Sequence, residues 1–216
     1  TASGRLGEAS FTADARLAPL ANPLLRSLDG EVHNLNLAAF DATLPATRID
    51  ASVSTKPKAD GLTGSFRARN ASPGAWDQDR VPLAALNADF TLSPSALALT
   101  AVDATLAGNA SASGQVTLFF AAKGFAAQVA LDVADLDLTQ IHTQLVATRL
   151  RGRLTADLTE GRQDIVADLA QQNLAFALAA TVTGTRVDVT RLSARAGGGE
   201  FSGRGNIDLE RERPFT

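Results

Sequence analysis

The sequence predicts an all-β protein, an elongated sheet built from stacked repeats. Apolar and polar residues alternate with a period of two over most of the chain, which places one face of each strand on apolar surroundings and the other in water. These runs recur about every 10 to 15 residues between Gly, Asn, Asp, Ser and Pro, which is the spacing of all-β folds. The stretch Leu97–Leu118 returns as Val187–Leu209. A pattern that returns along a chain indicates a repeat architecture.

Taken in order, the alternating runs predict strands around residues 11–17, 49–53, 86–92, 102–106, 129–133, 154–158, 165–169 and 207–209. Long helical patterns between these runs are missing, which argues against parallel strands joined by helices. Two pieces have helical spacing instead. They are residues 20–28, between Pro19 and the turn at Asp29-Gly30, and residues 138–145, after Asp137. We expect one or two helical turns in each.

Two further repeats indicate the size of the unit. Gly7–Leu17 aligns without gaps on Gly199–Leu209. The motif Leu-x-Gly-x-apolar begins at Leu28, Leu62 and Leu150, and the last two copies are 88 residues apart, whereas Leu97 and Val187 are 90 apart. We therefore expect a unit of about 90 residues. The chain is then one continuous β-repeat segment of a longer protein, with a partial unit at 1–60 and units at about 61–118 and 119–216.

Composition excludes several classes of protein. The 216 residues are 45% hydrophobic and 20% charged, so the chain should be ordered. A net charge of -3 with interspersed signs argues against nucleic acid as a partner. The chain has no cysteine, which excludes disulfides and thiolate metal sites. The longest apolar runs are far shorter than the ~18–20 residues of a spanning helix, so we expect no transmembrane span in this segment.

The side chains that could carry chemistry form no specific constellation. His33 and His142 are the only histidines, and no ordered carboxylate cluster accompanies either, so neither a zinc site nor a Ser-His-Asp triad is indicated. Asp132, Asp135 and Asp137 lack the glycine and the closing glutamate of a calcium loop and favour a solvated strand face. We expect no enzyme activity, no cofactor and no metal.

Two loop features have an ordinary structural interpretation beside a functional one. Gly197-Gly198-Gly199 does not match the phosphate-binding patterns and favours a turn or bulge. Trp76 lies in the longest non-alternating loop, residues 70–82. We expect it to pack over the end of a sheet, with a ligand anchor as the alternative.

The apolar face of the strands remains as the candidate site. Ala fills many inward positions, and the chain has Phe 10, Trp 1 and Tyr 0, which is a thin filling for a closed core. Two interpretations stay open: a narrow sandwich or β-solenoid that closes on alanine, or a sheet curled into an open trough whose floor takes acyl chains. The candidate groove residues are Phe11, Leu17, Leu86, Phe90, Leu97, Leu99, Val102, Leu106, Val129, Leu131, Val133, Leu154, Leu158, Ile165, Leu169, Leu174, Phe176, Leu178, Val187, Val189, Ile207 and Leu209.

Several segments also match a known family. They are Gly64-Ser65-Phe66 running into residues 70–83, Val133–Leu138 before Ile141-His142, Leu150–Leu154, and Gly203–Leu209 closing on Arg213-Pro214-Phe215. In their order and spacing they resemble the periplasmic repeat region of the AsmA-like superfamily, most closely the TamB family (translocation and assembly module inner-membrane subunit). The resemblance covers nearly the whole chain, although its motifs are degenerate.

The resemblance implies a β-taco, a sheet folded into a U-shaped trough with an apolar interior. It implies a periplasmic location, with the full-length protein anchored in the inner membrane of a Gram-negative bacterium by an N-terminal helix. It also implies phospholipid movement toward the outer membrane, outer-membrane biogenesis with a BamA-like partner in that membrane, and no catalysis. Three functions follow as hypotheses: a conduit for phospholipid acyl chains, a chaperone for outer-membrane β-strands, or a closed structural spacer.

Overall fold

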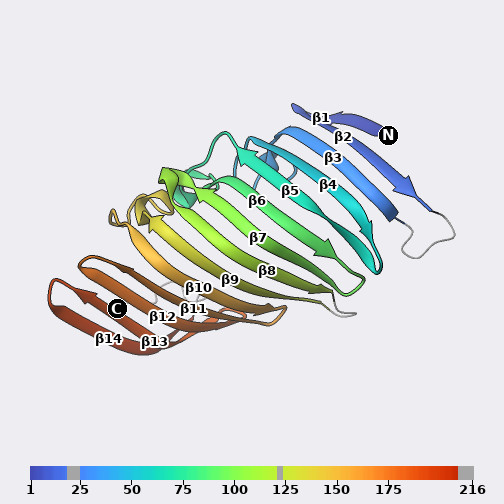
Figure 1. Cartoon of the computed structure of the whole chain (residues 1–216). Coiled ribbons are helices and arrows are strands. Elements are labelled where there is room, and N and C mark those ends of the chain that lie inside the picture. The colour runs from blue at the N-terminus through green and yellow to red at the C-terminus, as the bar shows by residue number, and fades with distance from the viewer. Residues whose placement is uncertain (19–24, 121–123, 209–216) are drawn as a thin grey trace.

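The computed structural model describes residues 1–18, 25–120 and 124–208, and its main elements are fourteen β-strands (Figure 1). The strands are β1 (Ala2–Leu6), β2 (Ala9–Leu17), β3 (Leu25–Leu35), β4 (Ile49–Lys58), β5 (Gly61–Asn70), β6 (Leu83–Leu92), β7 (Ala96–Leu106), β8 (Ser111–Phe120), β9 (Phe125–Leu136), β10 (Leu150–Thr159), β11 (Arg162–Gln171), β12 (Leu174–Thr183), β13 (Arg186–Ala196) and β14 (Gly199–Asp208). All the predicted strands are present, apart from residue 209, which lies outside the described residues.

The strands form one antiparallel sheet in which each strand pairs with its neighbours in the chain. The strand order runs from β1 to β14 without a crossover, and β1 and β14 do not pair with each other. Short turns connect most of the strands, which is possible because antiparallel neighbours need no crossover segment. The predicted all-β class and its elongated, curled sheet are confirmed.

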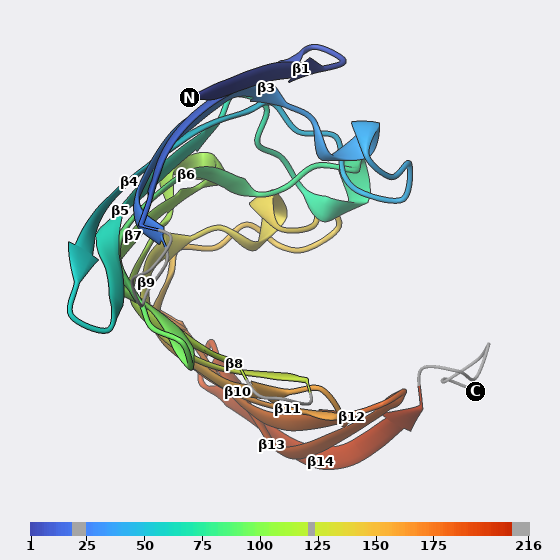
Figure 2. The same ribbon diagram turned by 90° about the vertical axis from the view of Figure 1, so that its right-hand side faces the viewer.

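Viewed along the stack, the sheet has a C-shaped profile (Figure 2). Bulges explain how the strands bend. The pairing register shifts around Asn34 in β3, Ala101 in β7 and Asp135 in β9, and these residues have φ angles of 54°, 49° and 53°. A bulge inserts an extra residue on one strand, bends it and increases its local twist. Bulges on several strands therefore curl the sheet.

The bulges also keep the apolar residues on one face. In β7, Leu97 and Leu99 are followed by Val102, so the apolar period slips by one residue at Ala101. On a regular strand Leu99 and Val102 would point to opposite faces. The register shift compensates, because Leu99 pairs with Val116 of β8 and Val102 pairs with Gly114, two residues away on the same face.

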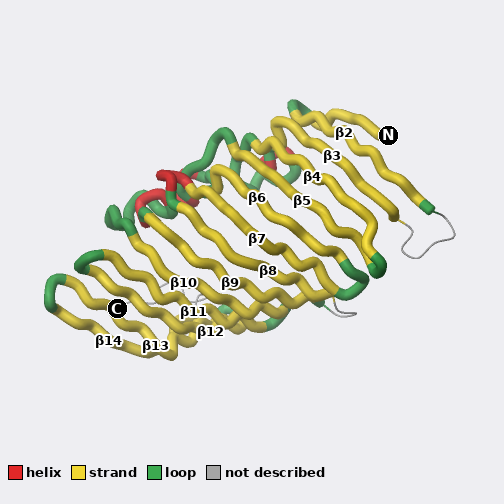
Figure 3. The backbone as a smooth tube through the Cα atoms, in the orientation of Figure 1, coloured by secondary structure: helices red, strands yellow, loops and turns green. Residues whose placement is uncertain are grey.

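In the described part of the chain, four 3₁₀ turns lie between strands: η1 (Leu37–Ala39), η2 (Trp76–Gln78), η3 (Ala107–Asn109) and η4 (Leu138–Gln140). Figure 3 shows them near one end of the strands. The helical piece expected at 138–145 is present as η4, although it is only one turn long. The piece expected at 20–28 is wrong over its described part, because residues 25–28 belong to β3. The pairing of β3 with β2 outweighs the helical spacing of the leucines there. Residues 20–24 lie outside the described residues.

A repeat not found from the sequence relates η1 to η4. Leu35–Ile49 and Leu136–Leu150 are 101 residues apart and share the pattern Leu-(Asn/Asp)-Leu, followed by Ala-Thr-Arg that begins eleven residues after the first leucine. Asn36 and Asp137 cap the two turns, because each side chain accepts a hydrogen bond from the backbone N–H two residues on, at 3.2 and 3.0 Å. The unit that this repeat marks contains six strands, since β3 corresponds to β9.

One of the two repeats found in the sequence also indicates a unit of six strands, and the other does not. Leu97–Leu118 covers β7 and β8, and its copy covers β13 and β14, six strands later. The two Leu-x-Gly-x-apolar motifs that are 88 residues apart lie in β5 and β10, which are five strands apart. They therefore do not mark the same unit. The unit boundaries at 60 and 118 stay a prediction.

Thr148 anchors η4 to the sheet. Its hydroxyl accepts a hydrogen bond from the N–H of Leu138 at 3.0 Å and donates one to the carbonyl of Leu136 at 2.9 Å. Thr47 holds the same position beside η1 and makes the same two bonds, at 2.9 and 3.1 Å. Both threonines are buried. The hydroxyl therefore attaches the turn to the strand end, and the N–H of Thr148 adds a bond to the Asp137 carboxylate at 3.2 Å.

We expect Thr148→Val to lower the free energy of unfolding by about 1–3 kcal/mol, because it leaves a part-buried N–H and carbonyl without their partner. Urea denaturation followed by circular dichroism measures this. Thr100→Val is the matched control, since Thr100 is exposed on β7 and the change there should be within about 0.5 kcal/mol. Equal stability of the two variants would contradict the anchoring role.

Candidate functional site

The apolar residues of the strands gather on one face of the sheet. Residues paired directly across an antiparallel ladder point to the same face, so the register assigns every strand position to one side. Phe90 of β6 pairs with Leu99 of β7, which pairs with Val116 of β8, which pairs with Val129 of β9. The row continues across β10 to β13 through Ala156, Ile165, Ala180 and Val189.

This row is an apolar stripe that runs across the strands. It crosses eight strands, from β6 to β13, and at about 4.8 Å per strand it extends for about 34 Å. All the predicted groove residues that the structure describes lie on this same face, and Leu209 lies outside the described residues. They are not brought together in one compact site but spread from β2 to β14.

None of the register-matched positions on the apolar face carries a charge. Its few polar residues include Thr55 and Asn70, both buried. The opposite face carries the charged side chains. Register pairs on that face include Arg153 with Asp132, and Arg195 with Glu200. The alternation in the sequence thus places the apolar residues on one face of the sheet and the charged residues on the other.

The apolar face is not sealed by a second layer of sheet in the described part of the chain. The narrow sandwich or solenoid is therefore wrong for these residues. Most positions buried on this face are alanines, and no large side chain among the described residues is fully buried. Apolar side chains at both ends of the sheet are exposed, among them Phe11 and Phe201.

The apolar face lies on the inner side of the curled sheet. The loop of residues 71–82, which carries η2, projects to the inner side of the C-shaped profile (Figure 2). Val81 of this loop lines a cavity of about 30 Å³ together with Ile49 and Ala68, which belong to the apolar face. The loop and the apolar face therefore share one side of the sheet, the concave one.

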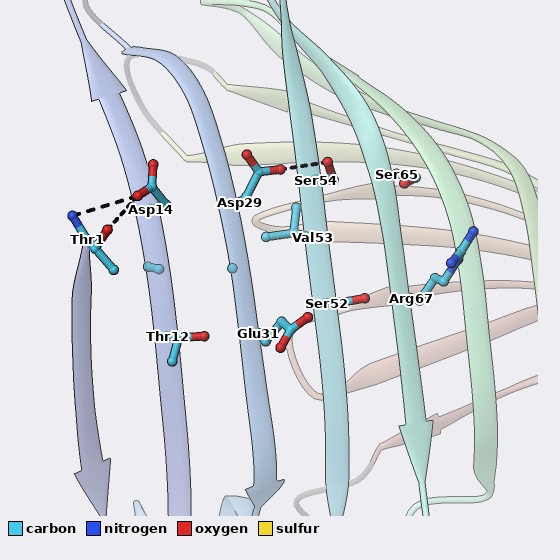
Figure 4. A pocket seen from close by; sticks show the side chains of 12 residues that line it. Thr1, Thr12, Asp14, Asp29, Glu31, Ser52, Val53, Ser54, Ser65 and Arg67 are labelled. Atoms are coloured by element: carbon cyan, nitrogen blue, oxygen red, sulfur yellow. Dashed lines mark hydrogen bonds and ion pairs between the residues drawn. The ribbon is translucent and has the colours of Figure 1, made fainter.

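The convex face is polar and charged. Figure 4 looks onto its N-terminal end, where Asp14, Asp29, Glu31 and Arg67 line a shallow hollow of about 480 Å³. The Ser54 hydroxyl donates a hydrogen bond to Asp29 at 2.6 Å. The hollow is open to solvent, and its carboxylates come from two strands, Asp14 from β2 and Asp29 and Glu31 from β3.

Ion pairs lie on the C-terminal part of the convex face, one between strands and one within β11. Arg191 of β13 reaches across β12 to Asp168 of β11 at 2.9 Å. The Arg162 guanidinium donates to Asp164 at 2.7 Å, and this bond, with a second from the Thr181 hydroxyl, holds the pKa of the Asp164 carboxyl below its ordinary value. Both pairs are exposed, so they contribute little to stability.

Three loops near one end of the strands form a group that we name the turn cluster: residues 36–48, 71–82 and 137–149. The N–H of Ala46 donates to the carbonyl of Asp79 at 2.9 Å, and the N–H of Trp76 donates to the carbonyl of Ile141 at 3.0 Å. Backbone bonds thus join the middle loop to both others.

A side-chain contact strengthens the second link. The N–H and the hydroxyl of Thr143 both donate to the Asp77 carboxylate, and His142 Nδ1 lies 3.7 Å from it. The hydroxyl bond is the main reason why the pKa of Asp77 lies below its ordinary value. Asp77 and Thr143 are 66 residues apart in the chain, so nothing local in the sequence indicates this contact.

The other residues singled out from the sequence have the following places. His33 is exposed on the convex face, 3.6 Å from Asp50. Asp132 is exposed on the convex face, Asp135 is the bulge residue of β9, and Asp137 caps η4. Gly197 and Gly198 form the turn between β13 and β14, with φ angles of 54° and 87°. Among the described residues, no group of three potential metal ligands is present.

Sequence reasoning missed Asn70 and misjudged the surroundings of Trp76. The Trp76 side chain is 52% exposed rather than packed over the sheet, because its loop projects beyond the strand ends. Asn70 ends β5 on the apolar face, and its Oδ1 accepts from the N–H groups of Arg48 and Ser72. Its Nδ2 is buried without a hydrogen-bond partner in the part of the chain that the structure describes.

The fold and its apolar face define a class: a single-layer, curled antiparallel β-sheet whose concave face has no charge at its paired strand positions. No family model, no curated protein and no solved structure matches this chain. The resemblance to the TamB family therefore stays a prediction. No helix among the described residues has the length and hydrophobicity needed to cross a bilayer.

Proposed function

We propose that this protein binds the acyl chains of phospholipids on its concave face and carries them without catalysis. The observation that supports this most is the apolar row from Phe90 to Val189, which runs across the strands on a face whose register-matched positions carry no charged side chain. Phe90 and Ala156 are buried, and the other members of the row are only partly buried. A continuous apolar surface that stays partly open to solvent marks a binding surface.

The energetics of such binding follow from the composition of the face. Each CH₂ group of an acyl chain that leaves water contributes about 0.8 kcal/mol of binding free energy. A long acyl chain therefore binds through many small and equal contributions. The row contains no polar side chain that would fix the chain at one place. A chain can therefore shift along the row at little cost, while its head group stays in water.

The route and the partners of this carrier rest on the resemblance to the TamB family. We propose a periplasmic location and movement of phospholipid between the inner and the outer membrane. A BamA-like protein in the outer membrane would be the partner of the full-length protein. The trough-shaped fold that the resemblance implied is the reason to retain these proposals.

Native mass spectrometry of the purified protein, followed by lipid extraction, tests the binding step. We expect bound phospholipid that survives desalting, in more than one stoichiometry, because the row has no fixed end point. Uptake of a fluorescent fatty acid should saturate at comparable occupancy. A ligand-free mass together with no fatty-acid uptake would rule out the proposal.

A second candidate is the binding of client β-strands at an edge of the sheet. It is favoured by β1, which is hydrogen-bonded to β2 alone among the described strands. An exposed edge can accept an added strand. A synthetic strand peptide should then bind, and proline substitutions in β1 should abolish that binding while lipid uptake is retained.

A further inference from the structure

We infer that the turn cluster is a docking site for a lipid bilayer surface, from which the concave face receives its acyl chains. Only the transfer of acyl chains to the concave face rests on the proposed function, and the docking itself does not. The first observation is a set of exposed large apolar side chains on all three loops: Phe40, Leu44, Trp76, Leu145 and Val146. Their exposed fractions range from 42% for Leu44 to 70% for Val146.

Hydrogen bonds between the loops fix the positions of these side chains. The three loops are joined by the Ala46–Asp79 and Trp76–Ile141 backbone bonds and by the Asp77–Thr143 contact. Leu44 and Leu145 hold equivalent positions in the repeat of 101 residues, and both are exposed. A repeated exposed leucine fits an extended, uniform partner such as a bilayer better than a single protein epitope.

The charges of the turn cluster nearly balance, which suits the zwitterionic surface of a bilayer. Its carboxylates are Asp41, Asp77, Asp79 and Asp137. Three of them accept hydrogen bonds within the loops, Asp41 from Thr43, Asp77 from Thr143 and Asp137 from Thr139. Arg48, Arg80 and Arg149 are exposed in the same three loops, and none of them makes an ion pair within the described residues. Guanidinium groups beside apolar side chains are complementary to lipid phosphates above acyl chains.

The turn cluster is also continuous with the apolar face. Val81 of the middle loop packs beside Ile49 and Ala68 of that face. Aromatic residues such as Trp76 and Phe40 are favoured at the boundary between head groups and acyl chains. A bilayer bound at the loops would therefore place acyl chains next to the concave face.

Trp76 is the sole tryptophan and reports on the contact directly. Vesicles of phosphatidylcholine with a minor fraction of phosphatidylglycerol should shift its fluorescence to shorter wavelength, and lipids with brominated chains should quench it. The variant with Phe40→Ser, Leu145→Ser and Val146→Ser retains Trp76 and should bind vesicles about tenfold more weakly in a flotation assay. Phe119→Ser is the control, because Phe119 is 39% exposed on the convex face of β8 and its loss should leave vesicle binding unchanged.

The substituted side chains are exposed, so the variants should fold, which circular dichroism verifies. An unshifted Trp76 emission, or a triple variant that floats as well as the wild type, overturns the inference. Loading the protein from detergent-solubilised phospholipid separates the two proposals. Loading without vesicle binding would refute the docking site and leave the carrier function in place. Vesicle binding without loading would refute the carrier function, and with it the role of the site as a source of lipid.

Discussion

Gly152→Ala is expected to lower the free energy of unfolding by about 3 kcal/mol. Gly152 lies inside β10 with a φ angle of 151°, a backbone conformation that alanine rarely adopts. A Cβ atom there would overlap the carbonyl oxygen of Asp168 on the adjacent strand. The backbone of β11 would have to move away, which disturbs the ladder on both sides. Urea denaturation followed by circular dichroism measures the loss.

The same motif supplies the control. Gly30 is the glycine of the Leu-x-Gly-x-apolar motif in β3, and a Cβ atom there would meet only ordinary contacts, the closest at 3.5 Å. Gly30→Ala should therefore be neutral or stabilising by up to about 1 kcal/mol, since glycine weakens a strand. If both variants lost the same stability, the close approach of β11 would not explain the motif.

The second large effect concerns the concave face. We expect the variant with Leu131→Arg and Leu169→Glu to lose phospholipid binding while the sheet stays folded. A charge covered by acyl chains costs about 2.5 kcal/mol or more, which is roughly a seventyfold loss of affinity for each charge that a chain covers. In the lipid-free protein these side chains can reach water, because both residues are only partly buried. Native mass spectrometry and fatty-acid titration measure the loss.

The matched control places the same charges on the other face of the same strands. Ala130 of β9 and Val166 of β11 lie on the convex face, next to the charged residues. The variant with Ala130→Arg and Val166→Glu should bind lipid as the wild type does. Equal lipid binding by both double variants would show that the concave face is not the binding surface. Unfolding of the first variant alone would show that its apolar face is a closed core.

Much of the fold was predictable because the residues along a strand alternate according to the environment of its two faces. Runs such as Leu86–Leu92 alternate in step with the pleat, so their strand class and their apolar side follow from the residues alone. The 3₁₀ turn at 138–140 was also indicated, through the capping residue Asp137. The helical spacing of the four leucines at 20–28 led to a wrong prediction over residues 25–28, because pairing with β2 outweighs it there.

The bulges and the repeat of 101 residues were also visible in the sequence, but they did not enter the predictions. The slips from Leu99 to Val102 and from Val133 to Leu136 break the period of two, and each marks a bulge. The repeat at Leu35–Ile49 and Leu136–Leu150 was visible as a shared Leu-(Asn/Asp)-Leu pattern. Asn70 gave no such signal, since its buried amide depends on the positions of Arg48 and Ser72.

By itself the sequence determined eight of the fourteen strands, namely β2, β4, β6, β7, β9, β10, β11 and β14, together with the apolar side of each and the absence of charge at the paired positions on that side. It did so because period-two alternation is a local property of the chain. Tertiary structure alone decided that these sides join into one concave face without a second layer, and that Asp77 meets Thr143. These depend on the register between strands and on where bulges bend the sheet, and pairing between strands establishes both.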